Sequence, residues 1–362
     1  MPESSDKTEN AETPTPDESK QRPKPSVMRD ILTLVRLPNL FTVVADTLMG
    51  LCIVYTANNL AHLEGASAFP LVASIPLQSL LLVLASVCFY AGGVVLNDRF
   101  DLVLDRRERP ERPLPAGRIS PAFATTLGAG LMLAGLAAAF VAAKHVGADR
   151  PGSPIFHPVM IYAYLLVAAI LAYNGRLKST RFSPIAMGGC RALNMAMVMS
   201  TAGCGDSIEW SIIVGLFIYV AGITWLAREE AGSPRRSELG GATVTLAVGL
   251  IYMTVVIPAY LAATIFGGAS FFGMALIKLT DAERMRLLLS FTALLGMTLW
   301  RCTAVLRDPR PEKVRAAVGG SILMLIVIDA LLIFSLSDPR WAVGVLLLIL
   351  PAVITRRFVS PT

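Results

Sequence analysis

The chain has 362 residues, of which 54% are hydrophobic and 16% are charged, with a formal net charge of +6. A soluble domain usually carries about a quarter charged residues, and here long apolar runs separate a few short charged clusters. We therefore expect a single polytopic membrane domain over residues 27–362. A nucleic-acid partner is not expected, because the basic residues lie in the loops between apolar runs instead of on a soluble face.

Residues 1–26 differ from the rest of the chain in composition. They are rich in Pro, Glu, Ser and Thr and contain almost nothing that a core would bury. Such segments cannot offset the entropy of folding. We predict a disordered cytoplasmic tail over residues 1–26.

Apolar runs bounded by Pro, Gly and charged residues predict the membrane-spanning helices, for which about 20 residues each suffice. The last two runs lie close together and are able to form one broken helix, so the sequence predicts nine or ten spans. Small residues dominate the third run between residues 128 and 143, which predicts close helix packing there. In chain order the runs are 32–56, 71–97, 121–144, 156–174, 184–203, 209–227, 241–266, 285–305, 318–336 and 340–355.

Lysine and arginine in short loops predict the orientation of these spans, since the more basic loops face the cytoplasm. The loops after the second, fourth and sixth spans are basic, whereas loops 57–70 and 204–208 contain no Lys or Arg. Lys20, Arg22, Lys24 and Arg29 precede the first span. We expect the amino terminus and the basic loops on the cytoplasmic side.

An acidic motif ends the second span, with the sequence LNDRFDLVLDRRERPERPLPAG. Helical spacing of three, four or seven residues places Asn97, Asp98, Asp101 and Asp105 along one stripe. Like charges at this spacing repel unless a cation is present. Mg²⁺ takes oxygen ligands from one or two carboxylates together with substrate phosphates. The stripe predicts a Mg²⁺ site, and the alternative is a solvated helix end whose acids pair with neighbouring arginines.

The motif resembles the first aspartate-rich motif of UbiA prenyltransferases, including the trailing Arg112-Pro113-Leu114 and Gly117. Further resemblances lie in the R-x-x-N opening at Arg36 to Asn39 and in Tyr173 and Lys178, a Y-x-x-x-K element that is one residue longer here. The run MGGCRALN is similar to a bacterial subgroup of the family. The resemblance is good over about residues 30–235.

This resemblance implies an all-helical membrane enzyme whose helices surround a central cavity open to the cytoplasm and to lipid. It implies a prenyltransferase of the bacterial inner membrane that uses Mg²⁺, a prenyl diphosphate and a lipophilic or aromatic acceptor. The implied metal ligands are Asn97, Asp98, Asp101, Asp105 and Glu230. The implied diphosphate-binding residues are Arg112, Lys178, Arg181 and Arg228, and the implied catalytic residues are Arg112, Tyr173, Lys178, Arg191 and Asn194.

The chain departs from the family pattern after the sixth span. A second motif of D-x-x-x-D type is usual there, but this chain has Arg228, Glu229 and Glu230 and no aspartate from residue 207 to residue 280. Glu230 is able to replace an aspartate as an oxygen ligand. The alternative is that both glutamates are solvated and paired with Arg235 or Arg236.

Asp46, Arg191 and Asp329 fall inside apolar spans, where charge is costly and normally meets a partner or a wet cavity. Arg191 is expected to pair with a motif carboxylate or with the diphosphate, or else to snorkel near a helix end. Asp46 and Asp329 are single intramembrane acids. Each fits either the cavity or a polar contact between helices.

Three functions remain open at this stage. The first is transfer of a prenyl group through an allylic carbocation to an electron-rich, most often aromatic, acceptor. The second is cyclisation of the same cation by a UbiA-type terpene cyclase, which the altered second motif keeps open. The third is a membrane transporter or scaffold, although the sequence shows no convincing internal repeat.

Overall fold

The computed structural model describes residues 26–62, 76–147, 152–202, 207–230, 234–263, 281–337 and 339–359. The predicted tail lies outside the described residues, apart from Ser26. All regular elements in the described part of the chain are helices, which confirms the all-α class. Cys204 and residues 63–75 and 264–280, which include the ends of the predicted spans 71–97 and 241–266, are likewise outside it.

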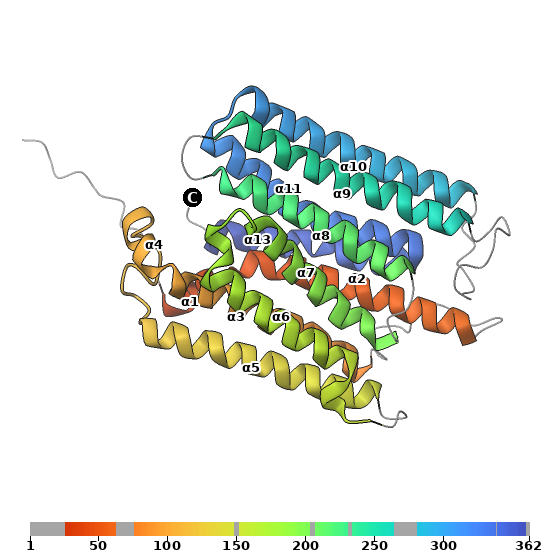
Figure 1. Cartoon of the computed structure of the whole chain (residues 1–362), viewed down its shortest axis with the longest axis horizontal. Helices are drawn as coiled ribbons and strands as arrows, with labels where there is room; N and C mark the ends of the chain where they lie inside the picture. The colour runs from red at the N-terminus through yellow and green to blue at the C-terminus, as the bar shows by residue number, and fades with distance from the viewer. Residues whose placement is uncertain are drawn as a thin grey trace, which may run out of the picture.

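Figure 1 shows the long helices lying side by side. Ser26 caps α1 by accepting a hydrogen bond from the Arg29 backbone N–H, and Ser120 caps α5 in the same way. The α-helices are α1 (Val27–Leu34), α2 (Leu37–His62), α3 (Leu77–Phe100), α4 (Leu102–Glu108), α5 (Pro121–Val146), α6 (Pro158–Gly175), α7 (Ser183–Met199), α8 (Ser207–Arg228), α9 (Arg236–Ala263), α10 (Asp281–Arg307), α11 (Pro311–Leu336), α12 (Pro339–Leu347) and α13 (Ile349–Val359).

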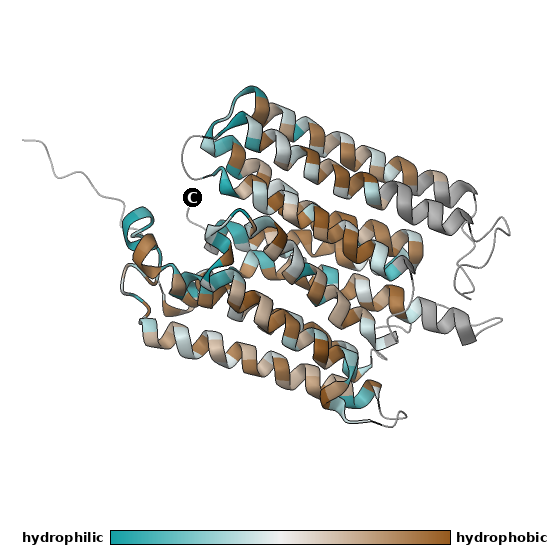
Figure 2. Ribbon diagram, in the orientation of Figure 1, coloured by the Kyte–Doolittle hydropathy of each residue, from teal (hydrophilic) through white to brown (hydrophobic). Residues whose placement is uncertain are grey.

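Eight stretches of helix in the described residues are long and apolar enough to cross a membrane. They lie in α2, α3, α5, α6, α8, α10 and α11 and in the α12–α13 pair, which together makes one stretch from Pro339 to Phe358. Eight of the predicted spans overlap these stretches, and the remaining two, 184–203 and 241–266, overlap α7 and α9. The total of nine or ten crossings stays a prediction. Hydrophilic residues gather at the end of the bundle where α3 and α4 meet (Figure 2), which we call the polar end.

Two hydrophobic cores share the interior of the bundle. One is built mainly from α8 to α12, and the other mainly from α3, α5 and α6. Helices α2 and α7 contribute to both, since Met49 and Met195 lie in the first core and Leu51 and Met197 in the second. These two helices therefore join the two halves of the molecule.

Helices α3 and α5 pack closely because glycine removes side chains from their interface. A Cβ atom at Gly128 would lie 2.7 Å from Leu96 Cγ, and one at Gly135 would lie 2.7 Å from Phe89 Cε1. Real Cβ atoms do not approach other atoms so closely. The prediction of close packing by the small residues of 128–143 is confirmed.

The junction between α1 and α2 turns sharply at Arg36. This residue has a φ of +50°, which is the left-handed region that side chains with a Cβ rarely adopt. The turn allows α2 to begin at Leu37, immediately before Pro38, and it brings the Arg36 side chain towards α3. This strained residue therefore directs its side chain towards the candidate site.

The α3–α5 interface generates a stability prediction. Gly128→Ala should lower the free energy of unfolding by about 1–3 kcal/mol, because the new methyl group would clash with the Leu96 side chain. The matched control is Gly130→Ala on the same helix, where nothing lies within 4 Å of the added Cβ. Thermal unfolding in detergent would measure both variants, and equal stability of the two would contradict this account of the interface.

Candidate active site

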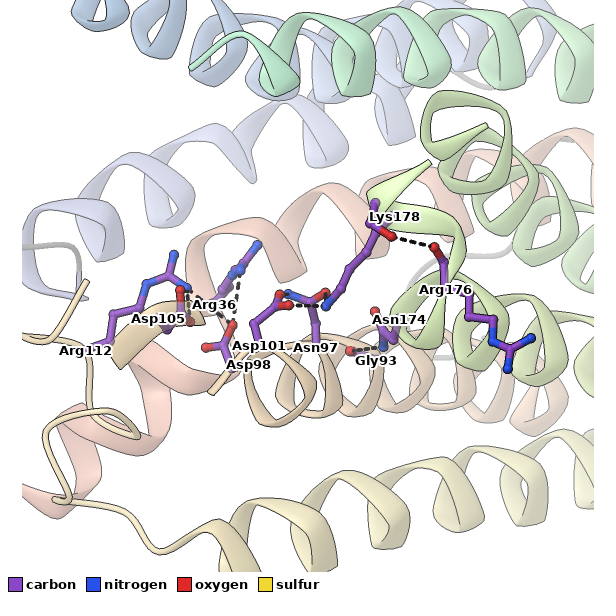
Figure 3. Close-up of polar contacts among 11 residues, drawn as sticks. Arg36, Gly93, Asn97, Asp98, Asp101, Asp105, Arg112, Asn174, Arg176 and Lys178 are labelled. Atoms are coloured by element: carbon purple, nitrogen blue, oxygen red, sulfur yellow. Dashed lines mark hydrogen bonds and ion pairs between the residues drawn. The ribbon is translucent and has the colours of Figure 1, made fainter. Parts of the chain in front are cut away.

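The acidic motif lies at the polar end, where α3 passes into α4. Asn97 and Asp98 belong to the last turn of α3, Asp101 caps it, and Asp105 lies in α4. Backbone hydrogen bonds from Asp101 N to Asn97 O (2.9 Å) and from Asp105 N to Asp101 O (2.8 Å) carry the helical register across the junction. The spacing that the sequence predicted is therefore retained, and Figure 3 shows the four side chains along α3 and α4.

Asn97, Asp101 and Lys178 form the first of two charge centres. Asn97 Nδ2 donates to Asp101 Oδ2 at 3.1 Å, and Lys178 Nζ donates to Asn97 Oδ1 at 3.4 Å. The same ammonium group forms an ion pair with Asp101 Oδ1. Lys178 belongs to a short 3₁₀ turn (Leu177–Ser179) after α6, so two segments distant in sequence supply this centre. One cation thus lies against two oxygen atoms of the motif.

Asp98 and Asp105 form the second charge centre, and both are buried. Arg112 Nη1 lies 2.9 Å from Asp105 Oδ2 and 3.6 Å from Asp98 Oδ1, so one guanidinium bridges the two carboxylates. Arg36 Nη2 lies 3.3 Å from Asp98 Oδ1 on the other side. The predicted single stripe is therefore divided in two, since Asp98 and Asp105 share Arg112 whereas Asn97 and Asp101 contact Lys178 (Figure 3). The roles of Asp98 and Asp105 as metal ligands stay predictions.

The chemistry of the first centre fits a magnesium ion. An amide oxygen and a carboxylate oxygen converge on the Lys178 ammonium, which marks a position that a cation occupies favourably. Within the described ranges no three or more His, Cys, Asp or Glu side chains lie close enough to hold a metal. A Mg²⁺ ion at Asn97 and Asp101 would therefore need further oxygen ligands, which phosphate groups of a substrate supply.

Tyr173 and Asn174 end α6 beside this centre. Asn174 Nδ2 donates to Gly93 O at 2.8 Å, a buried contact that fixes the end of α6, and so the turn with Lys178, against α3. The Tyr173 hydroxyl interacts electrostatically with Arg36 and Asp101. Sequence reasoning did not place Arg36 or Asn174 in the site. The R-x-x-N opening was a signal for Arg36, and Asn174 had none.

Glu230 follows α8 and lies among arginines from four different segments. Burial raises the pKa of its carboxyl above the ordinary value, and Arg315, Arg109, Arg36 and Arg356 oppose that shift in order of decreasing effect. Arg36 also pairs with Asp98, so the same guanidinium interacts with both Glu230 and the motif.

Glu229 is turned the other way, towards the start of α9. It accepts a hydrogen bond of 2.9 Å from the backbone N–H of Arg235 and forms a long ion pair of 3.9 Å with the Arg235 guanidinium. Glu229 is therefore paired with Arg235, which was the alternative for both glutamates. The role of Glu230 as a metal ligand stays a prediction.

Four predicted site residues lie apart from the two charge centres. Arg181 is exposed and stacks over the Phe182 ring at 5.1 Å, and Arg228 is exposed at the end of α8. Arg191 donates through Nη2 to Thr42 O at 3.0 Å and forms an ion pair with Asp46. Asn194 is buried, and its Nδ2 has no hydrogen-bond partner in the described structure. Arg191 therefore meets an intramembrane acid of α2, not a motif carboxylate.

The all-helical membrane fold, with an acidic motif at the end of α3, defines an integral membrane protein with a candidate cation site. Comparison with known proteins identifies its family. The model of the UbiA prenyltransferase family matches residues 63–318. The chain belongs to the UbiA prenyltransferase family. The match extends beyond residue 235, where the sequence resemblance was expected to end, and it includes the motif, Lys178 and Glu230.

Several curated relatives are named digeranylgeranylglyceryl phosphate synthase. The one from Methanoregula boonei is 29% identical over 170 residues, which is 46% of this chain and 53% of the relative. The one from Methanoculleus marisnigri is 48% identical over 61 residues, which is 17% of this chain and 22% of the relative. The chain thus spans about half or less of the length of the curated relatives it matches.

A solved structure described as giving insights into the biosynthesis of digeranylgeranylglyceryl phosphate synthase in membranes aligns with a TM-score of 0.54. Its sequence is 17% identical, and the alignment covers 85% of this chain and 98% of that one. This likeness shows that the two chains share a fold.

The first charge centre predicts competition between Lys178 and a metal ion. Lys178→Met should strengthen Mn²⁺ binding in the absence of diphosphate by about fivefold, or roughly 1 kcal/mol, because the ammonium no longer competes for Asn97 and Asp101. Paramagnetic resonance of Mn²⁺ would measure the affinity, and Lys313→Met, which removes an exposed lysine bound to Asp308, is the control. Equal or weaker binding by Lys178→Met would contradict the assignment of the cation position.

Proposed function

We propose that this enzyme transfers an isoprenyl group from a prenyl diphosphate to an acceptor, with Mg²⁺ held by Asn97 and Asp101. The observation that carries the proposal is the convergence of two motif oxygens on the Lys178 ammonium at the polar end. Bound Mg²⁺ would neutralise charge on the diphosphate and favour its departure. Glu230, across Arg36 from the motif, is the proposed additional oxygen ligand.

The basic residues of the two centres are the proposed diphosphate clamp. Lys178 and Arg112 already lie against motif carboxylates, at the positions from which they are able to reach phosphate oxygens. Once a metal occupies Asn97 and Asp101, the Lys178 ammonium is free to turn towards the phosphate. Charge that develops on the leaving diphosphate is then met by fixed cations, which is the largest stabilising effect in many such reactions.

The proposed reaction breaks the bond between the first prenyl carbon and the diphosphate oxygen, and both electrons leave with the diphosphate. The acceptor supplies the electron pair for the new bond to that carbon and loses a proton. The protein need not supply a nucleophile for these steps. Apolar helices around the site would exclude water, so that the acceptor outcompetes hydrolysis.

For the acceptor, we propose a molecule that carries an anionic group. Arg315 and Arg356 lie at the polar end near Glu230, and the Arg356 guanidinium packs on Gly319, one turn after Arg315, where a Cβ would lie 2.8 Å from its Nη2. Neither arginine pairs with a carboxylate within the described structure apart from this longer-range interaction with Glu230. A phosphate satisfies this arrangement, as the names of the relatives suggest, and so does an aromatic acid. The bacterial inner membrane and the cytoplasmic orientation remain predictions.

The central test is diphosphate release by purified protein in detergent, with Mg²⁺ and radiolabelled prenyl diphosphates of several lengths. Asp101→Ala should lower the rate at least 100-fold, because the cation site loses its carboxylate. Asp308→Ala removes an exposed acid that pairs with Arg310 and Lys313 and should behave as wild type.

The products separate the remaining functions. Release that requires an added acceptor supports transfer, and release with a cyclic hydrocarbon product would identify a terpene cyclase. No release from any diphosphate, with Asp101→Ala equal to wild type, would contradict catalysis at this motif.

The arginines of α11 and α13 generate a prediction about the acceptor. Arg315→Gln and Arg356→Gln should each raise the KM for a phosphate- or carboxylate-bearing acceptor about tenfold, because a charged hydrogen bond is lost. The KM for prenyl diphosphate should not change. Arg107→Gln, on the exposed side of α4, is the control. Unchanged KM for every anionic acceptor would remove these arginines from the acceptor site.

A further inference from the structure

Three charged side chains meet in the interior of the bundle, away from the motif. Asp46 lies on α2, Arg191 on α7 and Asp329 on α11. Asp46 and Asp329 are 0% exposed, and the Arg191 side chain is 10% exposed. Both acids fall within helices apolar enough to cross a membrane, so this cluster lies where unpaired charge is most costly.

The contacts of the cluster are unequal. Arg191 Nε forms an ion pair with Asp46 Oδ2, and Arg191 Nη2 donates to Thr42 O at 3.0 Å. The Asp329 carboxyl interacts with both Asp46 and Arg191. In the described structure, however, no hydrogen-bond donor reaches either oxygen of Asp329 if both acids are ionised, whereas Asp46 has the Arg191 guanidinium beside it.

The charges of the cluster do not balance with both acids ionised. Two carboxylates and one guanidinium sum to a charge of −1, and no other charged group of the described residues interacts with the two acids. Buried ions without compensation are strongly disfavoured. One added proton makes the cluster neutral, and it also provides the missing donor, because a protonated carboxyl donates to a neighbouring carboxylate.

We propose that Asp46 and Asp329 hold one proton between them and form, with Arg191, a neutral proton-binding site that joins α2, α7 and α11. Asp46 is the ionised partner of Arg191, and Asp329 carries the proton and donates it in a hydrogen bond to Asp46. A monovalent metal cation would balance the same charge and is the competing occupant.

The site lies where it is able to fix the positions of three helices relative to one another. Helix α2 begins beside Arg36, and α7 follows the turn that carries Lys178, so both helices lead from the motif to the cluster. Helix α11 packs against α2 and carries Arg315 near its start. A neutral contact among the three fixes their relative positions without leaving a charge in the membrane.

The experiment detects the protonated carboxyl directly, and it removes the acids of the cluster one at a time by substitution. Infrared spectroscopy of the wild-type protein should show the C=O stretching band of a protonated carboxylic acid. Asp329→Asn removes the band, and Asp46→Asn also removes it, because Asp329 then ionises to pair with Arg191. Asp308→Asn, in an exposed ion pair, retains the band.

Thermal unfolding of the same variants in detergent gives an independent readout. Each single variant keeps one carboxylate for Arg191 and should melt within a few degrees of wild type. The double variant Asp46→Asn/Asp329→Asn leaves Arg191 without a counter-charge and should melt roughly 10 °C lower. Adding Arg191→Gln to the double variant should restore most of that loss.

Three results would overturn the proposal. The first is a wild-type spectrum without the band, and the second is a band that persists in both single aspartate variants. The third is a melting temperature that depends on whether Na⁺ or a bulky organic cation is present, since a metal cation would then occupy the site instead of a proton. None of these measurements requires prenyl transfer, so the proposed function and this proposal are able to fail separately.

Discussion

Charge compensation at the edge of an apolar bundle is the constraint on which this structure depends. Acidic side chains spaced along one helix repel each other, and water screens them poorly beside a membrane. Each motif carboxylate therefore meets a cation from another segment, as Asp101 meets Lys178 and Asp98 meets Arg36. These pairs position the start of α2 and the turn after α6 around the end of α3. The same pairs bring the charged side chains of the candidate site together.

The motif and the helical class could be predicted from the sequence because both rest on local periodicity. The spacing of Asn97 and Asp101 fixes their shared face, and runs of apolar residues fix the spans. The partners could not be predicted in this way. Asp98 and Asp105 are seven residues apart and share Arg112, which comes from the loop beyond α4. Lys178 reaches Asp101 from a segment 77 residues away, and only the family resemblance indicated it.

The intramembrane charges show the same limit more sharply. Hydropathy marked Asp46, Arg191 and Asp329 as costly residues in apolar helices, and contact between helices was one of the expected explanations. That all three belong to one cluster depends on how α2, α7 and α11 pack, which no local pattern encodes. Glu230 could be predicted in part, because it lies where the family usually has its second motif. Its arginine neighbours could not, because they come from four segments of the fold.

The two cores of the bundle meet along α7, and the side chains at this boundary are methionines. Met195 and Met199 enter one core, whereas Met197 enters the other. Methionine is unbranched and flexible, so it fills differently shaped gaps with little change in energy. A boundary of this kind permits the halves of the molecule to slide slightly against each other while both remain packed. Changes of methionine rotamer along α7 would then keep both cores packed when the shape of either one changes.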